Sequence, residues 1–270
     1  MRILLITRID DDEAFSYAQN LKKDLILIGH WVQSDHGSDS ESDSSDPTLV
    51  KGSLDLVVII GGDGTILRTV QQMERQIPLI GINWGEVGFL ADLEPKTALS
   101  FLTSLEQNFP IEQRMRIAFT KEGTHLGDAL NEALIVTTRP AKMLRFSVII
   151  DDEPAGQFRA DGLLVSTPTG STAYAMSAGG PIIDPRVQGI LLVPLAPYKL
   201  SSRPQLISSD RRIGIRLESS KPAHLVIDGQ RTVELGADDV IDVARSSSPA
   251  LFVDAGRNFF SKVDEKLRRL

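Results

Sequence analysis

Apolar and polar positions alternate between two periods over about the first 110 residues. Four short aliphatic runs predict strands that are buried on both faces, namely Ile3–Ile6, Leu25–Ile28, Leu56–Ile60 and Leu79–Ile82. Helical spacing predicts helices at Asp12–Lys23, at Thr65–Gln76, and from Pro95 onward with Ala98, Leu99, Leu102 and Leu105 on one stripe. This alternation predicts an α/β domain with a Rossmann-like, doubly wound parallel sheet, whose ligands bind beyond the carboxyl ends of the strands.

The pattern changes near Arg114. Short apolar stretches are now separated by Gly, Pro, Asp and Ser, at Ile117–Thr120, Ala133–Thr137, Phe146–Ile150, Leu163–Ser166, Gly214–Leu217, Leu225–Ile227 and Val240–Val243. This spacing predicts a C-terminal, mostly antiparallel β domain with one small helical segment near Ala173–Ser177. Residues Asn258–Leu270 predict a helix that packs back onto one of the domains. We therefore expect domains at 1–110 and 111–255, followed by a helix within 256–270.

Composition narrows the classes of function. The chain has 270 residues, 41% hydrophobic and 24% charged, which is typical of a globular protein. The absence of cysteine excludes disulfides, thiolate metal sites and cysteine nucleophiles. Apolar runs such as Val57–Ile60 are too short to span a membrane, and no signal peptide is visible, so we expect a cytoplasmic protein that does not insert into membranes.

Charge is unevenly distributed. Five acidic residues lie in the Ser/Asp-rich tract Ser34–Pro47, so the net charge of −7 leaves only −2 for the rest of the chain. The tract has no aliphatic or aromatic residue and is predicted to be a mobile loop. The nearly neutral remainder does not favour nucleic acid as a partner.

A glycine-rich turn follows one predicted strand directly. Leu56–Ile60 leads into Gly61-Gly62-Asp63-Gly64-Thr65 and then into a helix, an arrangement that favours phosphate binding. The turn is neither a Walker A loop, because no Gly-Lys-Ser/Thr follows, nor G-x-G-x-x-G. A bound phosphate would repel the Asp63 carboxylate, so this residue is unexpected here unless the carboxylate binds a metal or accepts a proton. Phosphoryl transfer to an alcohol requires such a carboxylate near the phosphates and within reach of the hydroxyl. The alternative is that Asp63 only caps the helix.

A second segment, Ser166–Gly180, is rich in hydroxyls and glycine, which suits a polar ligand such as a ribose, and Tyr174 could stack on a ring. The alternative is a Ser/Thr-rich surface turn. At Asn131-Glu132, a carboxylate could accept two hydrogen bonds from a vicinal diol. Asp228-Gly229-Gln230 predicts a hairpin turn. The four histidines lack metal-ligand spacing, so no metal site made by protein ligands alone is expected.

Together, these segments resemble the NAD kinase family. The resemblance rests on Gly61–Thr65, Gly81-Ile82-Asn83, Gly88-Phe89-Leu90, Asn131-Glu132, Asp161–Gly180 and Asp228–Gln230, which occur in the family's order. It implies phosphoryl transfer from ATP or polyphosphate to the adenosine-ribose 2′-hydroxyl of NAD, with Asp63 as the catalytic base. It further implies a nucleotide site formed by Asp63, Gly64, Arg68, Asn131, Glu132, Lys142, Arg159, Asp161, Thr172, Ala173, Tyr174, Ala175, Met176, Ser177, Ala196 and Gln230, with Phe89 as an additional candidate.

The resemblance also implies an α/β domain paired with a β domain, and a C-terminal segment that returns to the first domain. A divalent metal (Mg²⁺ or Mn²⁺) and a homodimer or homotetramer are expected on the same basis. Two alternatives remain open: a lipid or diacylglycerol kinase that shares Gly61–Thr65, and a non-catalytic NAD(P) sensor. The near-neutral charge argues against the first, and the retained Asp63 against the second. A Rossmann dehydrogenase is disfavoured because no G-x-G-x-x-G follows the first strand.

Overall fold

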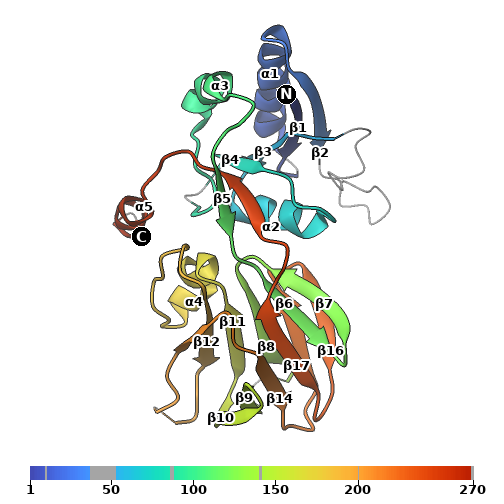
Figure 1. Cartoon of the computed structure of the whole chain (residues 1–270), viewed down its shortest axis with the longest axis vertical. Helices are drawn as coiled ribbons and strands as arrows, with labels where there is room; N and C mark the ends of the chain where they lie inside the picture. Colours follow the sequence, from blue (N-terminus) through green and yellow to red (C-terminus); the bar gives the residue numbers. More distant parts are fainter. Residues whose placement is uncertain (10, 37–52, 86–87, 140–141, 200, 269–270) are drawn as a thin grey trace. The chain divides into compact units, whose positions relative to one another are not determined.

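The computed structural model describes residues 1–9, 11–36, 53–85, 88–139, 142–199 and 201–268 (Figure 1). The chain divides into two compact units, the first formed by Met1–Gln113 with Ala250–Leu270 and the second by Arg114–Pro249. Of the acidic tract predicted as a loop, Ser34, Asp35 and His36 instead end a strand, and the remainder lies outside the described residues.

The first unit contains a six-stranded sheet in the order β2-β1-β3-β4-β18-β5. Its strands are β1 (Arg2–Thr7), β2 (Trp31–His36), β3 (Leu56–Gly61), β4 (Leu79–Asn83), β5 (Ile111–Arg114) and β18 (Ala250–Val253). The pairs from β2 through β18 are all parallel. The sequence predicts that residues up to 255 belong to the β domain. Strand β18 instead joins the sheet of the first unit, where Phe252 pairs with Leu79 of β4.

The described part of this unit has four α-helices, namely α1 (Asp12–Leu27), α2 (Asp63–Gln72), α3 (Pro95–Ser104) and α5 (Phe259–Leu267). Helix α1 begins where the Asp11 carboxylate accepts a hydrogen bond from the Ala14 N–H at 2.8 Å, and α3 begins with Pro95. Asn258 caps α5 in the same way, through the Ser261 N–H. The helix predicted within Asn258–Leu270 is therefore confirmed.

The strand predicted at Leu25–Ile28 is wrong, since these residues end α1 and the strand is β2. Leu25 continues the helical stripe of Ala14, Ala18 and Leu21, all of which are buried. Leu27, by contrast, is 83% exposed, which a strand buried on both faces would not allow. A short aliphatic run at the end of an amphipathic helix has the same composition as a buried strand, so the run alone misleads.

The second unit contains two antiparallel sheets, ordered β10-β9-β14-β17-β6-β7 and β13-β12-β11-β8-β15-β16. The first comprises β6 (Ile117–Lys121), β7 (Thr124–Ala129), β9 (Leu144–Ile150), β10 (Glu153–Ala160), β14 (Ile213–Leu217) and β17 (Val240–Arg245). The second comprises β8 (Glu132–Thr137), β11 (Gly162–Ser166), β12 (Gly189–Leu195), β13 (Gln205–Ser208), β15 (Ala223–Ile227) and β16 (Arg231–Leu235). The seven apolar stretches predicted as strands are thereby confirmed.

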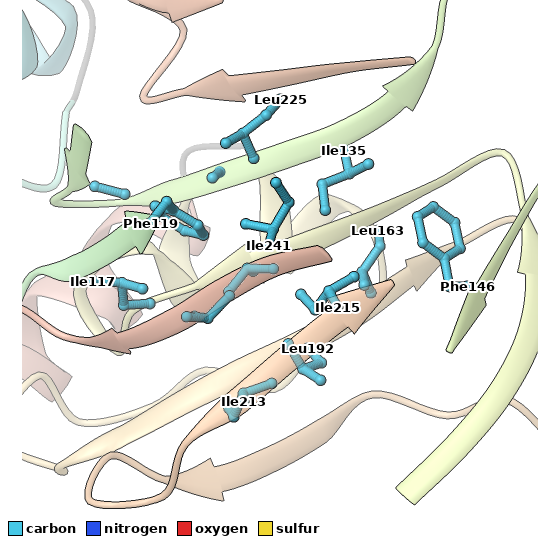
Figure 2. Packing of buried hydrophobic residues seen from close by; sticks show 14 of the residues in the cluster. Ile117, Phe119, Ile135, Phe146, Leu163, Leu192, Ile213, Ile215, Leu225 and Ile241 are labelled. Carbon is cyan, nitrogen blue, oxygen red and sulfur yellow. The ribbon is translucent and has the colours of Figure 1, made fainter. Parts of the chain in front are cut away.

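Side chains from both sheets share one core, shown in Figure 2. Phe119, Phe146 and Ile215 come from the first sheet, and Ile135 and Leu163 from the second. The unit is therefore a β-sandwich whose two inner faces interdigitate. The predicted helical segment is confirmed as a 3₁₀ turn, Thr169–Thr172, followed by α4 (Tyr174–Ser177).

The predicted fold class, an α/β unit followed by a mostly antiparallel β unit, is confirmed. Among the described residues, no helix has both the length and the apolar character needed to cross a bilayer.

Candidate active site

The glycine-rich loop of the first unit connects β3 to α2. Strand β3 ends at Gly61, Gly62 precedes the helix, and Asp63 is the first helical residue. The N–H groups of Thr65 and Ile66 donate to the Gly62 carbonyl, at 3.1 and 3.3 Å. The first N–H groups of a helix have no partner within that helix, and Gly64 is exposed there. This end of α2 can therefore bind a phosphate group.

Asp63 is held by the segment that follows β4. Its Oδ2 accepts a hydrogen bond from the Phe89 N–H at 2.6 Å, and its Oδ1 accepts one from the Leu90 N–H at 2.9 Å. Gly88 permits this approach, since a Cβ at that position would lie 2.1 Å from Oδ1. Gly62, not Asp63, precedes the helix, so capping does not account for this aspartate. Each carboxylate oxygen keeps a lone pair with which to accept a proton.

The segment holding Asp63 is itself attached to the sheet and to α5. The N–H groups of Asp92 and Leu93 donate to the Gly81 carbonyl of β4. Lys262 of α5 forms a salt bridge with the Asp92 carboxylate. Lys266, one turn further along α5, has its Nζ 4.6 Å from the centroid of the Phe89 ring. The segment that binds the Asp63 carboxylate is therefore fixed by contacts with β4 and α5, while Asp63 itself belongs to α2.

In the second unit, Asp228 organises the start of β8. The Asp228 carboxylate accepts hydrogen bonds from the N–H groups of Leu130, Asn131 and Glu132, at 2.7, 2.8 and 3.0 Å. The predicted hairpin turn is present, since Asp228 and Gly229 adopt φ of 47° and 67° between β15 and β16. Sequence reasoning missed the second role of Asp228, because an aspartate in a turn carries no sign of a contact about 100 residues away.

Glu132 is an unusual acid in this setting. Burial, and to a smaller extent the nearby Asp228 carboxylate, raise the pKa of Glu132 to about 8. The Oε2 atom of Glu132 and the Oδ1 atom of Asn131 are buried and have no hydrogen-bond partner among the described residues. Buried polar atoms of proteins are nearly always satisfied, so these two mark a place where a ligand with hydroxyl or N–H donors fits.

The hydroxyl-rich segment lies against the same residues. The Thr167 hydroxyl donates to the Leu130 carbonyl at 2.6 Å, and the Thr167 N–H donates to the Asn131 carbonyl at 2.8 Å. A Cβ at Gly170 would lie 2.1 Å from the Asn131 carbonyl oxygen, so only glycine fits there. The Ser171 hydroxyl also bonds within the segment, to the Pro168 carbonyl. These buried hydroxyls thus hold the backbone in place, which differs from the ligand-facing role expected of them.

Other predicted site residues of the second unit differ in their exposure. Tyr174 is 47% exposed and Ser177 is exposed, whereas Ala175 is buried, Thr172 is nearly so, and Ala173 and Met176 are half-buried. The Arg159 guanidinium lies 4.3 Å from the centroid of the Tyr198 ring. The Arg159 carbonyl accepts from the Tyr198 N–H, and the Asp161 N–H donates to the Leu195 carbonyl. Arg159 and Asp161 therefore contact residues on either side of Ala196, which is exposed.

The remaining candidates divide between the units. Arg68 lies half-buried on α2, one turn after Gly64, so it shares the helix face of the phosphate loop. Gln230 is exposed beside Asp228 in the hairpin turn. Lys142 is exposed, and no contact in the described residues connects it to the other candidates. Ligand binding by any of these residues stays a prediction.

No group of three His, Cys, Asp or Glu side chains that could hold a metal ion is found in the part of the chain that the structure describes. Magnesium is usually bound by one or two carboxylates together with water and substrate phosphates, so it does not need such a group. The anion-binding turn beside Asp63 fits an ion that arrives with a polyphosphate.

These features define a class of protein that joins a phosphate-binding α/β unit to a β-sandwich with a buried acid in a polar site. Models of the ATP-NAD kinase N-terminal and C-terminal domains match residues 16–108 and 130–255. The NAD kinases of Methanoregula boonei and Methanoculleus marisnigri are 62% and 56% identical to this chain, over the full length of both proteins in each case. The chain belongs to the NAD kinase family.

Solved structures agree with this assignment. The crystal structure of an NAD kinase from Archaeoglobus fulgidus in complex with ATP covers 100% of both chains, with a TM-score of 0.83 and 30% identity. The yeast NADH kinase complexed with NADH has a TM-score of 0.86 at 24% identity, covering 99% of this chain and 88% of the other, and shows the likeness of fold alone. The lipid kinase and sensor alternatives are not favoured by these findings.

Proposed function

We propose that this protein transfers the terminal phosphoryl group of ATP to the 2′-hydroxyl of the adenosine ribose of NAD, which yields NADP. The observation that carries the proposal is the Asp63 carboxylate, held by two backbone N–H groups at a phosphate-binding turn. Membership of the NAD kinase family and the likeness to a structure bound to ATP support the choice of substrates.

Asp63 accepts the proton of the 2′-hydroxyl as the new oxygen–phosphorus bond forms. The bond between the transferred phosphorus and its bridging oxygen breaks at the same time, and ADP leaves with the electron pair. Because the transition state of phosphoryl transfer is loose, most of the acceleration comes from positioning and from neutralising charge. The N–H donors of Phe89 and Leu90 fix the direction in which the carboxylate points.

The β unit supplies the acceptor site in this proposal. Asn131 and Glu132, with their unpartnered buried oxygens, bind hydroxyl groups of the nucleotide. Exposed Tyr174 is available to stack on a ring, and the other candidates from Thr172 to Ser177 line the same segment. Arg159, Asp161, Ala196, Gln230, Arg68 and Lys142 are proposed as further binding residues.

A divalent ion, Mg²⁺ or Mn²⁺, is proposed to enter with the phosphates of the donor, where it neutralises their charge. The Asp63 carboxylate would help to hold such an ion, while the N–H groups at the start of α2 would bind the phosphates. Polyphosphate remains a second candidate donor, because the turn recognises phosphate and not a base. A homodimer or homotetramer and a cytoplasmic location stay predictions.

The test is to incubate the purified protein with magnesium and NAD, add ATP or polyphosphate in turn, and measure NADP. The variant Asp63→Asn is compared with Asp55→Asn, a matched control whose exposed carboxylate accepts the Arg2 N–H at the opposite end of β3. We expect NADP from the wild type and from the control, and a rate lower by about 10²-fold in Asp63→Asn, the usual effect of removing a positioned base. A wild-type protein that makes no NADP from either donor overturns the proposal.

A further inference from the structure

The phosphate-binding turn lacks a lysine of its own. In a Walker A loop, a lysine within the motif reaches the terminal phosphates, but Gly61–Thr65 has no cationic side chain and offers backbone N–H groups, the Thr65 hydroxyl and the carboxylate of Asp63. A carboxylate this close repels a bound polyphosphate, because the two negative charges share one small site. A positive charge from elsewhere in the fold would reduce this repulsion.

Helix α5 brings such a charge to the segment that holds Asp63. Lys262 and Lys266 lie four residues apart and therefore on one face of the helix. The charge of Lys262 is already paired with the Asp92 carboxylate in a salt bridge. Lys266 instead places its ammonium 4.6 Å from the centroid of the ring of Phe89, the residue whose N–H donates to the Asp63 carboxylate.

Burial of the Lys266 ammonium destabilises the folded protein in the absence of a ligand. Lys266 is only 9% exposed, and among the described residues no carboxylate lies within 4.0 Å of its ammonium. Burial and, secondarily, the charge of Lys262 lower the pKa of Lys266 to about 8, although the carboxylates of Asp63, Asp92 and Glu265 oppose the shift. A buried ammonium without an ion-pair partner is rare, and an anionic ligand would supply the missing partner.

We infer that Lys266 binds a phosphate group of the donor, so that α5 adds a second cation to Arg68 of α2 at a turn that has none of its own. The cation–π contact holds the ammonium over the ring of Phe89, whose N–H donates to the Asp63 carboxylate. The ammonium and this carboxylate interact electrostatically, so the positive charge also reduces the repulsion between the carboxylate and the phosphates. This inference rests on the proposed function, and it adds a donor-binding residue to the site.

The alternative is that Lys266 only fixes the segment around Phe89, and the experiment separates the two roles. The variants Lys266→Met, Lys266→Gln and Lys266→Arg are compared with Arg268→Met, a control that removes an exposed cation paired with Asp264 on the same helix. Calorimetry measures the Kd for ATP without NAD. Initial rates measure the KM for ATP and for NAD separately, and thermal unfolding reports the Tm.

We expect the neutral variants to raise the Kd and the KM for ATP by about tenfold or more, the usual cost of losing a hydrogen bond to a charged group, with the KM for NAD within about twofold. Lys266→Arg should recover part of the loss, and Arg268→Met should behave as the wild type. ATP binding by the wild type should weaken above pH 8, as Lys266 loses its proton. An unchanged Kd for ATP, or a lower Tm with both KM values raised in parallel, overturns the inference. A wild type that binds ATP but makes no NADP refutes the proposed function and leaves the comparison of Kd values intact.

Discussion

The raised pKa of Glu132 predicts how NAD affinity depends on pH. With a pKa of about 8, only about one Glu132 in ten is ionised at pH 7 in the free protein, and about one in a hundred at pH 6. A ribose diol donates two hydrogen bonds, and the carboxylate can accept one on each oxygen, whereas the protonated acid carries a hydrogen on one of its oxygens. Binding therefore requires ionisation first, and the measured affinity is reduced by the ionised fraction.

The expected magnitude follows directly. NAD affinity should rise about ninefold from pH 6 to 7 and about fivefold from pH 7 to 8, and then level off within a further factor of about two, because the ionised fraction saturates above the pKa of Glu132. Near pH 7, the binding of each NAD should release about one proton. Isothermal titration calorimetry in the absence of ATP, in buffers of different ionisation enthalpy, measures both quantities.

Two variants provide the comparison. Glu132→Gln cannot ionise, so it should bind NAD more weakly than the wild type at pH 8 and show no slope between pH 6 and 8. Glu153→Gln removes an exposed carboxyl group from β10 of the same unit and should retain the wild-type slope. A flat affinity in the wild type, or an equal slope in Glu132→Gln, would show that Glu132 does not bind the ribose as a carboxylate.

Three further predictions concern turnover and stability. Asp63→Asn should lower turnover by about 10²-fold while the Kd for NAD stays within about twofold; a normal rate would exclude a catalytic base at this position. Gly88→Ala should lower turnover at least about tenfold, because its Cβ would displace the Asp63 carboxylate, whereas Gly156→Ala, with open space around it, should not; equal rates would contradict the positioning argument. Finally, folding raises the pKa of Glu132 from 4.5 to about 8. Protonation of Glu132 therefore stabilises the folded state, with the full effect below pH 4.5, and this contribution is lost as the pH rises through 8. Denaturant titrations should show the free energy of unfolding falling by up to about 1.4 kcal/mol per pH unit in the wild type relative to Glu132→Gln, and parallel curves would refute this.

Much of the fold could be predicted because local patterns determine it. Buried strands such as β3 and the antiparallel strands of the second unit follow from short apolar runs between turn residues. The failure at Leu25–Ile28 arose where the end of an amphipathic helix has the composition of a strand. The place of β18 beside β4 could not be predicted, since pairing between segments more than 160 residues apart leaves no periodicity in either one.

The candidate site was predictable to the extent that it is local. Asp63 stood out because a carboxylate is unexpected in a phosphate-binding turn. Asp228 was predicted only as a turn residue and Lys266 was not singled out, because their significance comes from contacts across the fold, with the start of β8 and with Phe89. The hydroxyls near Thr167 suggested a ligand, but several of them satisfy backbone carbonyls, which the sequence alone cannot distinguish.

The placement of β18 and α5 in the first unit has a consequence for biosynthesis. Domains usually fold as they leave the ribosome, with the N-terminal one first. Here the sheet that carries the Gly61–Thr65 turn lacks β18, and the segment around Phe89 lacks the contact with Lys266, until the residues after Ala250 have been made. The β-sandwich is therefore complete in sequence before the phosphate-binding unit can be, and a nascent chain remains inactive until its final segment has emerged.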